Sequence, residues 1–191
     1  TQVANGLDIS LFASEELGLY SVIEIDWDER GRAWVIETRD YPNELKPAEL
    51  GKDRIKILED TDGDGKADKA ILFADKLSIP TGMCFARGGL IVQMAPHFLF
   101  LKDTDGDDKA DVREILFSGW STGDTHAGPS NLKYGFDNWI WGVMGYAGFN
   151  GKVGEKQHRF GQGVYRFKPD GSELEYLGRT SNNTWGLGFS E

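Results

Sequence analysis

The sequence has almost no cysteine. Cys84 is the single cysteine among 191 residues, so no disulfide can form within the chain. It stands in the apolar run Met83-Cys84-Phe85, which predicts a buried and unreactive thiol. No apolar stretch approaches the roughly 20 residues that a membrane-spanning helix needs, and no long amphipathic helical pattern is present. We therefore expect neither a membrane span nor a helical fold.

Positive charge is also scarce. The chain has 21 Lys and Arg against 31 Asp and Glu, for a formal net charge of −10. With no basic stripe to offset it, this charge repels phosphate backbones, so we expect no nucleic-acid partner. The sequence has no glycine-rich phosphate loop before a helix, no cysteine pair for haem and no serine elbow. Nicotinamide, haem and hydrolase chemistry therefore have no support in these residues.

Glycine and aromatic residues are plentiful. The chain has 25 Gly, six Trp and 12% aromatic residues. Together with the missing helical pattern, this composition favours many short strands joined by tight turns. The predicted fold class is all-β.

A longer pattern repeats along the chain. An inner-strand motif recurs at intervals of roughly 50 residues, the length expected of a four-stranded β-propeller blade. Its equivalent positions are Val22, Pro80, Pro129 and Thr184. The repeat predicts a partial propeller of about three blades, of a six-bladed type. A smaller open β-sandwich is the alternative fold.

The repeat also sets the expected boundaries along residues 1–191. The predicted blades span residues 21–78, 79–127 and 128–182. Residues 7–12 match the outermost strands of later units, so we expect them to form the outer strand of a closing blade. Residues 183–191 are expected to begin a fourth blade. A ring of this type needs further blades from a longer protein.

Two acidic loops are nearly identical. The segment Asp60-Thr-Asp62-Gly-Asp64-Gly-Lys66-Ala-Asp68 recurs as Asp103-Thr-Asp105-Gly-Asp107-Asp-Lys109-Ala-Asp111. Calcium takes six to eight oxygen ligands, and the carboxylates alternate along each loop with a free carbonyl at the lysine. The flanking residues read as strands, which argues against helix-loop-helix sites. The predicted Ca²⁺ ligands are Asp60, Asp62, Asp64, Lys66, Asp68, Asp103, Asp105, Asp107, Lys109 and Asp111.

The three hairpins differ in ways that bear on the metal. Gly65 occupies the sharp turn of the first loop and Asp108 that of the second, which predicts a weaker second site. The third unit has the turn Lys168-Pro-Asp-Gly-Ser172 there, which needs no metal. We therefore expect calcium to be structural, with an acidic turn that binds no ion as the alternative. Because millimolar calcium is found outside the cytoplasm, the loops favour an exported protein, periplasmic or at the cell surface.

Polar loops gather at the opposite end of the predicted strands. His126 lies in a glycine-bounded loop just before an inner strand, where its ring is suited to accept a proton near neutral pH. Asp124, two residues earlier, is expected to orient it. A loop histidine that only bonds backbone is the alternative. His97 and His158 are interpreted as packing or surface groups.

Several long motifs resemble one family. They are Asp26-Trp27-Asp28, Glu37 to Asn43, Asp60 to Asp68, Gly123 to Leu132 and Ser181 to Phe189. In these the chain resembles the PVC-type membrane-bound dehydrogenases, from about Leu7 to Glu191. That family is similar to the soluble glucose and aldose-sugar dehydrogenases, six-bladed propellers that hold pyrroloquinoline quinone (PQQ). Longer members continue into helical-repeat and c-type haem segments.

The resemblance implies roles for particular residues. His126 takes the place of the base that removes a substrate hydroxyl proton, and Asn183 that of a cofactor contact. Arg39, from the polar loops rather than from the resemblance, is a further candidate contact, with a structural pair with Asp40 as the alternative. Asn182 stands where the family has a quinone-binding arginine, and an amide cannot replace its bidentate bonds. The expected function is that of a calcium-binding sugar or alcohol dehydrogenase-like oxidoreductase, with PQQ as its expected cofactor. A non-catalytic propeller that binds a glycan or a protein partner is the alternative.

Overall fold

The fold consists almost entirely of β-structure. The computed structural model describes residues 3–43, 45–47 and 50–190. Within these residues, fourteen strands form four antiparallel sheets, and the one helix is the short 3-10 turn η1 (Glu15–Leu17). The all-β prediction is confirmed.

Three of the sheets share one strand order. The first sheet contains β1 (Val22–Trp27), β2 (Ala33–Glu37), β3 (Asp53–Glu59) and β4 (Lys69–Leu77). The second contains β5 (Gly82–Ala86), β6 (Gly89–Met94), β7 (His97–Lys102) and β8 (Val112–Ser118). The third contains β9 (Pro129–Tyr134), β10 (Ile140–Met144), β13 (Gly163–Phe167) and β14 (Leu174–Gly178). Each segment of the predicted repeat therefore holds one four-stranded meander.

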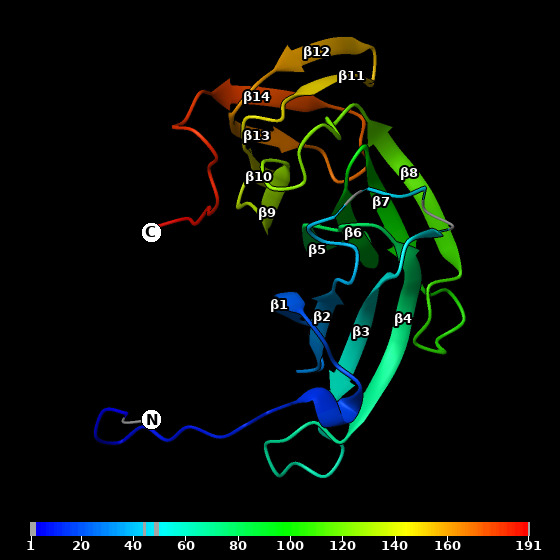
Figure 1. Ribbon diagram of the computed structural model, residues 1–191, viewed down its shortest axis with the longest axis vertical. Helices are drawn as coiled ribbons and strands as arrows, with labels where there is room; N and C mark the ends of the chain where they lie inside the picture. Colours follow the sequence, from blue (N-terminus) through cyan, green and yellow to red (C-terminus); the bar gives the residue numbers. More distant parts are fainter. Residues whose placement is uncertain (1–2, 44, 48–49, 191) are drawn as a thin grey trace.

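The three sheets follow one another along an open arc (Figure 1). The first strand of each sheet, β1, β5 and β9, lies on the inner side of the arc, and β4, β8 and β14 lie on the outer side. Antiparallel order alternates the connections between the two ends of the strands. The β3–β4 and β7–β8 loops share one end, and the β2–β3 and β8–β9 connections share the other.

A hairpin that the repeat pattern did not reveal is inserted in the connection between two neighbouring strands of the third sheet, β10 and β13, which pair directly with each other. Its strands, β11 (Phe149–Val153) and β12 (Lys156–Phe160), form a separate two-stranded sheet. The rings of Phe149 and Phe160 stack at 5.2 Å between their centroids, and Phe149 forms an isolated bridge with Trp120. The intervening residues are mostly exposed, so the apolar alternation that marks a strand is weak here. The connection between β10 and β13 therefore contains a β-hairpin.

The two terminal segments differ from expectation. Residues 7–12 form no strand, and their backbone meets the rest of the fold where the Ala67 N–H donates to the Phe12 carbonyl at 2.7 Å. This part of the chain has no sheet edge beside it to supply ladder hydrogen bonds, so the predicted outer strand does not form. Residues 183–190, the expected start of a fourth unit, also contain no strand. Glu191 lies outside the described residues.

The core lies between neighbouring sheets. Trp34 packs edge-on against Phe73 and Phe85 between the first and second sheets, at centroid distances of 4.5 and 5.2 Å. Trp120 stacks on Phe98 at 4.7 Å in the cluster between the second and third sheets. Cys84 is buried in that cluster, and burial raises the pKa of its thiol to about 12. The predicted burial of this cysteine is confirmed, and the raised pKa favours the unreactive thiol over the thiolate.

A carboxyl group on β1 is held against the second sheet. A Cβ atom added to Gly82 would lie 3.4 Å from Glu24 Oε2 and 2.0 Å from Gln93 Oε1, so these two oxygens surround the same glycine. Burial raises the pKa of Glu24 to about 7. The first and second sheets thus enclose an acid that titrates near neutrality.

Stability is expected to depend on this acid. The folded state keeps the Glu24 proton at pH values where the unfolded chain releases it, so the free energy of unfolding falls as pH rises from about 5 to about 7. We expect Glu24→Gln to remove about 2 kcal/mol of that pH dependence and to be more stable than the parent protein at pH 8. Urea unfolding at pH 5 and pH 8 measures this, with Glu29→Gln as the exposed control. Equal pH dependence in both variants would contradict it.

Candidate functional site

The first acidic loop brings three of its carboxylates together. Oxygens of Asp60, Asp62 and Asp68 lie within 4.8 Å of one another. The backbone N–H groups of Gly63 and Gly65 donate to Asp60 at 2.7 and 2.8 Å, and the Gly65 bond is the main cause of a lowered Asp60 pKa. Asp60 is therefore ionised and oriented by the loop backbone before any ion is added.

The second acidic loop repeats this arrangement with Asp103, Asp105 and Asp111, whose oxygens also lie within 4.8 Å of one another. In both loops the remaining predicted carboxylate lies outside the cluster. Asp64 accepts the Lys66 backbone N–H at 2.8 Å, and Asp107 accepts the N–H and the ammonium of Lys109 at 2.9 and 3.0 Å. The structure thus gathers three of the four predicted carboxylates in each loop.

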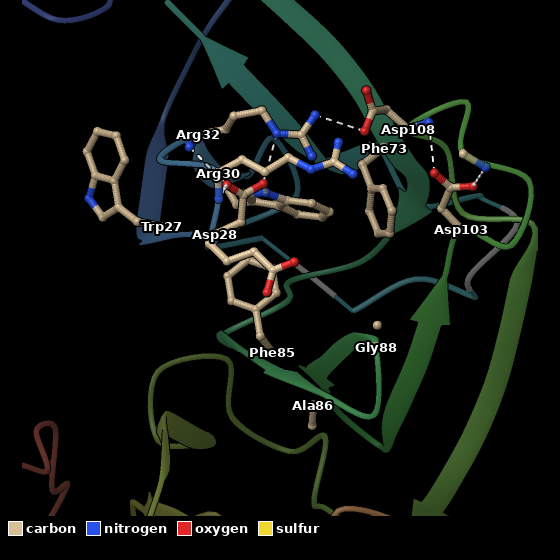
Figure 2. Close-up of a pocket in the computed structure, with 14 residues that line it drawn as sticks. Trp27, Asp28, Arg30, Arg32, Phe73, Phe85, Ala86, Gly88, Asp103 and Asp108 are labelled. Atoms are coloured by element: carbon tan, nitrogen blue, oxygen red, sulfur yellow. Dashed lines mark hydrogen bonds and ion pairs between the residues drawn. The ribbon is translucent and has the colours of Figure 1, made fainter.

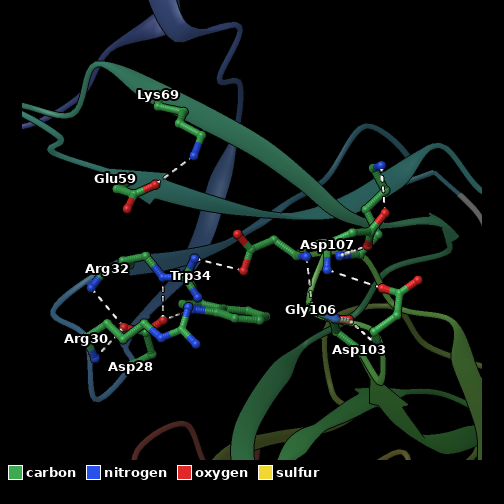
Figure 3. A network of polar contacts seen from close by, with 12 residues as sticks. Asp28, Arg30, Arg32, Trp34, Glu59, Lys69, Asp103, Gly106 and Asp107 are labelled. Atoms are coloured by element: carbon green, nitrogen blue, oxygen red, sulfur yellow. Dashed lines mark hydrogen bonds and ion pairs between the residues drawn. The ribbon is translucent and has the colours of Figure 1, made fainter.

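The second loop is attached to the first sheet. Asp108 adopts a φ of 63°, the left-handed conformation that its glycine counterpart allows more easily. Its carboxylate accepts a 2.8 Å hydrogen bond from Arg32 Nη1. Arg32 Nε donates to Asp28 at 2.8 Å, a contact that can be followed in Figure 3. Asp28 also accepts the indole N–H of Trp34 at 3.0 Å. Asp108, which stands where the first loop has Gly65, therefore forms an ion pair with Arg32 that joins the second loop to the first sheet.

The third hairpin closes without such a cluster. The Gly171 N–H donates to the Lys168 carbonyl at 2.8 Å, and the Lys168 N–H donates to the Glu173 carbonyl at 3.0 Å. The Ser172 hydroxyl donates to Asp170 at 2.6 Å. The tight turn predicted here is confirmed.

At the other end of the strands, two connections meet at His126. Thr125 Oγ1 donates to the Pro42 carbonyl at 3.2 Å, and the Tyr41 ring lies edge-on to the imidazole at 5.2 Å between centroids. The β2–β3 connection is in turn held by Asp53, a fully buried carboxylate. It accepts hydrogen bonds from the Thr38 hydroxyl and from the N–H groups of Arg39, Asp40 and Ile79.

His126 is exposed and has one free ring nitrogen. Its Nδ1 lies 3.1 Å from Thr125 Oγ1 and 3.6 Å from Asp124 Oδ1, which is an ion-pair distance rather than a hydrogen bond. Asp124 instead accepts the backbone N–H of His126 at 2.6 Å and the hydroxyl of Tyr146 at 2.8 Å. These two bonds lower the Asp124 pKa, so its charge faces the imidazole at neutral pH. Within the described part of the chain, Nε2 has no hydrogen-bond partner.

A cavity of about 460 Å³ opens beside this histidine. It is lined by Asn43, Leu45 and residues 122–126. A neighbouring cavity of about 660 Å³ includes Tyr146 and Arg159 on the hairpin side. Tyr146 therefore stands between the two openings with its hydroxyl on Asp124.

The two residues expected to contact a cofactor lie in different places. Asn183 Oδ1 accepts the Trp185 indole N–H at 3.0 Å and lies 2.6 Å from the position of a Cβ on Gly145. The same Cβ would meet the Ala127 carbonyl oxygen at 2.7 Å, so Asn183 flanks the backbone that follows His126. The Arg39 guanidinium lies 3.7 Å above the Tyr20 ring and does not line the His126 cavity.

Some groups at this end were not singled out from the sequence. Tyr146 lies in the connection that follows β10, 22 residues after Asp124, and no pattern along the chain indicates the hydrogen bond between them. Asp53 lies at the start of a strand, where its four donors cannot be inferred from spacing. His97 and His158 lie elsewhere: His97 Nδ1 is 2.7 Å from Ser118 Oγ, and burial lowers the pKa of His158.

Comparisons with known sequences identify the chain's family and nothing more specific. Among the described residues, no helix is both long and apolar enough to cross a membrane. No curated protein matches the chain. The family named as a domain of unknown function, DUF7133, matches residues 1–191. The chain therefore belongs to the DUF7133 family.

Proposed function

We propose that the three meanders are blades of a β-propeller completed by further blades of a longer protein. The shared strand order, the arc and the inner position of β1, β5 and β9 support this proposal. The two end sheets also expose apolar side chains that a neighbouring blade would cover. These are Ile23 and Ile25 at the first sheet and Tyr134 and Phe136 at the third. Residues 7–12 supply an outer strand once such a sheet edge is present.

Each acidic loop is proposed to bind one calcium ion. Three converging carboxylates suit a hard cation that prefers oxygen ligands, and the pre-oriented Asp60 and Asp103 support this choice. The role is structural, because the third hairpin closes the same connection with backbone and side-chain hydrogen bonds alone. A protein that needs such weak sites filled functions where calcium is abundant, which supports an exported location.

Calcium is expected to raise the melting temperature. Binding at about 100 times the dissociation constant stabilises the folded state by about 2.7 kcal/mol. Asp62→Asn should reduce this gain more than Asp105→Asn, because the first loop has glycine at its sharp turn. Asp170→Asn, at the metal-free third hairpin, is the matched control and should leave the calcium response unchanged. Differential scanning fluorimetry with Ca²⁺ and with chelator measures it; equal melting temperatures in both would refute the calcium proposal.

The His126 cavity is proposed to serve a sugar or alcohol dehydrogenase-like reaction. The observation that carries this is the free Nε2 of an imidazole whose other side faces the ionised Asp124. Nε2 accepts the proton of a substrate hydroxyl as the C–H bond releases hydride to a two-electron acceptor, and the carbon-oxygen bond becomes a carbonyl. The Asp124 charge stabilises the resulting imidazolium.

The quinone cofactor of the similar dehydrogenases does not fit the residues of this chain. PQQ carries several carboxylates, which are bound best by guanidinium or ammonium groups. The described lining of the His126 cavity contains no lysine or arginine, and Arg39 is engaged with Tyr20. We therefore assign no step to PQQ, and the acceptor is left to parts of the protein beyond these residues.

The test is a turnover assay. The protein completed by its remaining blades is purified and supplied with Ca²⁺, an electron-accepting dye and a panel of aldoses and simple alcohols, and reduction of the dye is followed. Dye reduction that depends on the sugar or alcohol supports the proposal. No dye reduction with any member of the panel would count against it.

The second candidate is a non-catalytic propeller that binds a glycan or a protein partner. The observation that favours it is the cavity lining, where amide, hydroxyl, carboxylate and imidazole groups can bind sugar hydroxyls although no cation is present. Saccharide binding that persists in His126→Ala, without turnover in either protein, distinguishes this function from the first.

A further inference from the structure

Another cavity lies at the opposite end of the strands, away from His126. It has a volume of about 570 Å³ and opens between the first and second sheets (Figure 2). Aromatic rings form much of its wall: Trp34 and Phe73 are buried, and Trp27 is 53% exposed at the rim. Phe85 completes the aromatic wall from the second sheet. The proposed dehydrogenase-like reaction does not use this cavity.

Most of the charged groups around the cavity already have partners. Arg32 is bound by Asp28 and Asp108, each at 2.8 Å, and Asp103 accepts backbone N–H groups of its own loop. These ion pairs and hydrogen bonds give the walls a defined shape. They leave little attraction for a simple cation or anion at those positions.

Arg30 is different. Its backbone N–H donates to Asp28 at 2.9 Å, but no interaction of its guanidinium with another described residue is found. Figure 2 shows the Arg30 side chain directed beside Arg32 toward Phe73, along the cavity. An uncommitted guanidinium beside aromatic faces offers bidentate hydrogen bonds to a carboxylate and stacking to the body of the same ligand.

We propose that this cavity binds a saccharide that carries a carboxylate, such as a uronic acid unit. The aromatic rings contact the apolar C–H face of the sugar, and Arg30 binds its carboxylate. The volume falls within the range of about 300 to 1,000 Å³ that is usual for small-ligand sites. Ligands with several phosphates fit less well than a sugar with one carboxylate at Arg30, because each phosphate brings more negative charge to a chain of net charge −10 whose carboxylates line the opening.

Isothermal titration calorimetry of the full chain with digalacturonate tests this proposal. We expect saturable binding, weakened about tenfold or more by Arg30→Gln, since a charge-assisted bidentate pair is lost. The affinity of Arg30→Lys should lie between those of the parent protein and Arg30→Gln, because lysine keeps the positive charge but cannot form the bidentate hydrogen bonds of a guanidinium. Arg159→Gln, at an exposed arginine on β12, is the control for net charge and should bind as the parent protein does.

Further ligands make the outcome decisive. The neutral disaccharide galactobiose should bind at least about tenfold more weakly than digalacturonate. Binding of a glutamate-rich peptide in place of digalacturonate, or digalacturonate binding that Arg30→Gln leaves unchanged, would overturn the proposal. His126→Ala should retain the binding, so failure of the dehydrogenase-like function and failure of this site are separately visible.

Discussion

Replacing Asp53 with alanine is expected to lower the free energy of unfolding by about 3 kcal/mol or more. The carboxylate is fully buried and accepts four hydrogen bonds, from the Thr38 hydroxyl and three backbone N–H groups. Without it, all four donors lack their acceptor, and those of Thr38, Asp40 and Ile79 remain buried. Urea unfolding followed by circular dichroism measures the loss.

Matched variants separate this effect from a general loss of charge. Asp75→Ala removes an exposed carboxylate on β4 and should change stability by less than about 0.5 kcal/mol. Asp53→Asn keeps the shape of the side chain, but one of the two carboxylate oxygens is replaced by an NH₂ group that donates hydrogen bonds. We therefore expect an intermediate loss in the free energy of unfolding. A loss below about 1 kcal/mol in Asp53→Ala would show that the connection does not depend on this carboxylate.

His126→Gln is expected to reduce kcat in the sugar-oxidation assay by about 10²-fold to 10⁴-fold, the usual contribution of a general base. Glutamine keeps hydrogen-bonding capacity but cannot accept the hydroxyl proton at neutral pH. KM should change much less than kcat, because the lining of the cavity is retained. Steady-state kinetics with the best aldose or alcohol of the panel provides the measurement.

The controls for this variant come from the same chain. His158→Gln alters a histidine on β12 that does not line the His126 cavity, so its kcat should match that of the parent protein. Tyr146→Phe removes the hydroxyl that donates to Asp124 and should lower kcat by a smaller factor, because Tyr146 positions the acid and does not contact the substrate. Unchanged kcat in His126→Gln would remove this histidine from the reaction.

The Arg32 contact shows where prediction along the chain stops. Asp28 belongs to one of the motifs that resemble the dehydrogenase family, and Asp108 differs from glycine at the sharp turn of the second acidic loop. Their connection through Arg32 joins residues 76 positions apart, and no local pattern specifies which sheets face each other at that point. The position of the Arg30 guanidinium also cannot be predicted from the sequence, because a charged residue in a turn usually points into solvent.

In two segments, the hairpin β11–β12 and residues 7–12, the pattern of apolar residues does not match the observed structure. The hairpin forms although its alternation is weak, because Phe149 and Phe160 pack on the aromatic cluster around Trp120. Residues 7–12 alternate clearly between Leu7, Ile9 and Leu11 and polar residues, yet remain unpaired because a strand needs a neighbouring edge. Strand formation in both segments depends on partners that local sequence does not describe.

Periodicity, turn residues and repeated motifs were enough to predict the all-β class, the twelve strands of the three meanders and the acidic loops. These features depend on neighbours within a few residues or on a regular repeat along the chain. The meeting of His126, Asp124 and Tyr146, the burial of Asp53 and the cavity beside Arg30 arise only when separate connections and sheets come together in space. Such contacts depend on packing between distant segments, which hydrophobic pattern and spacing leave open.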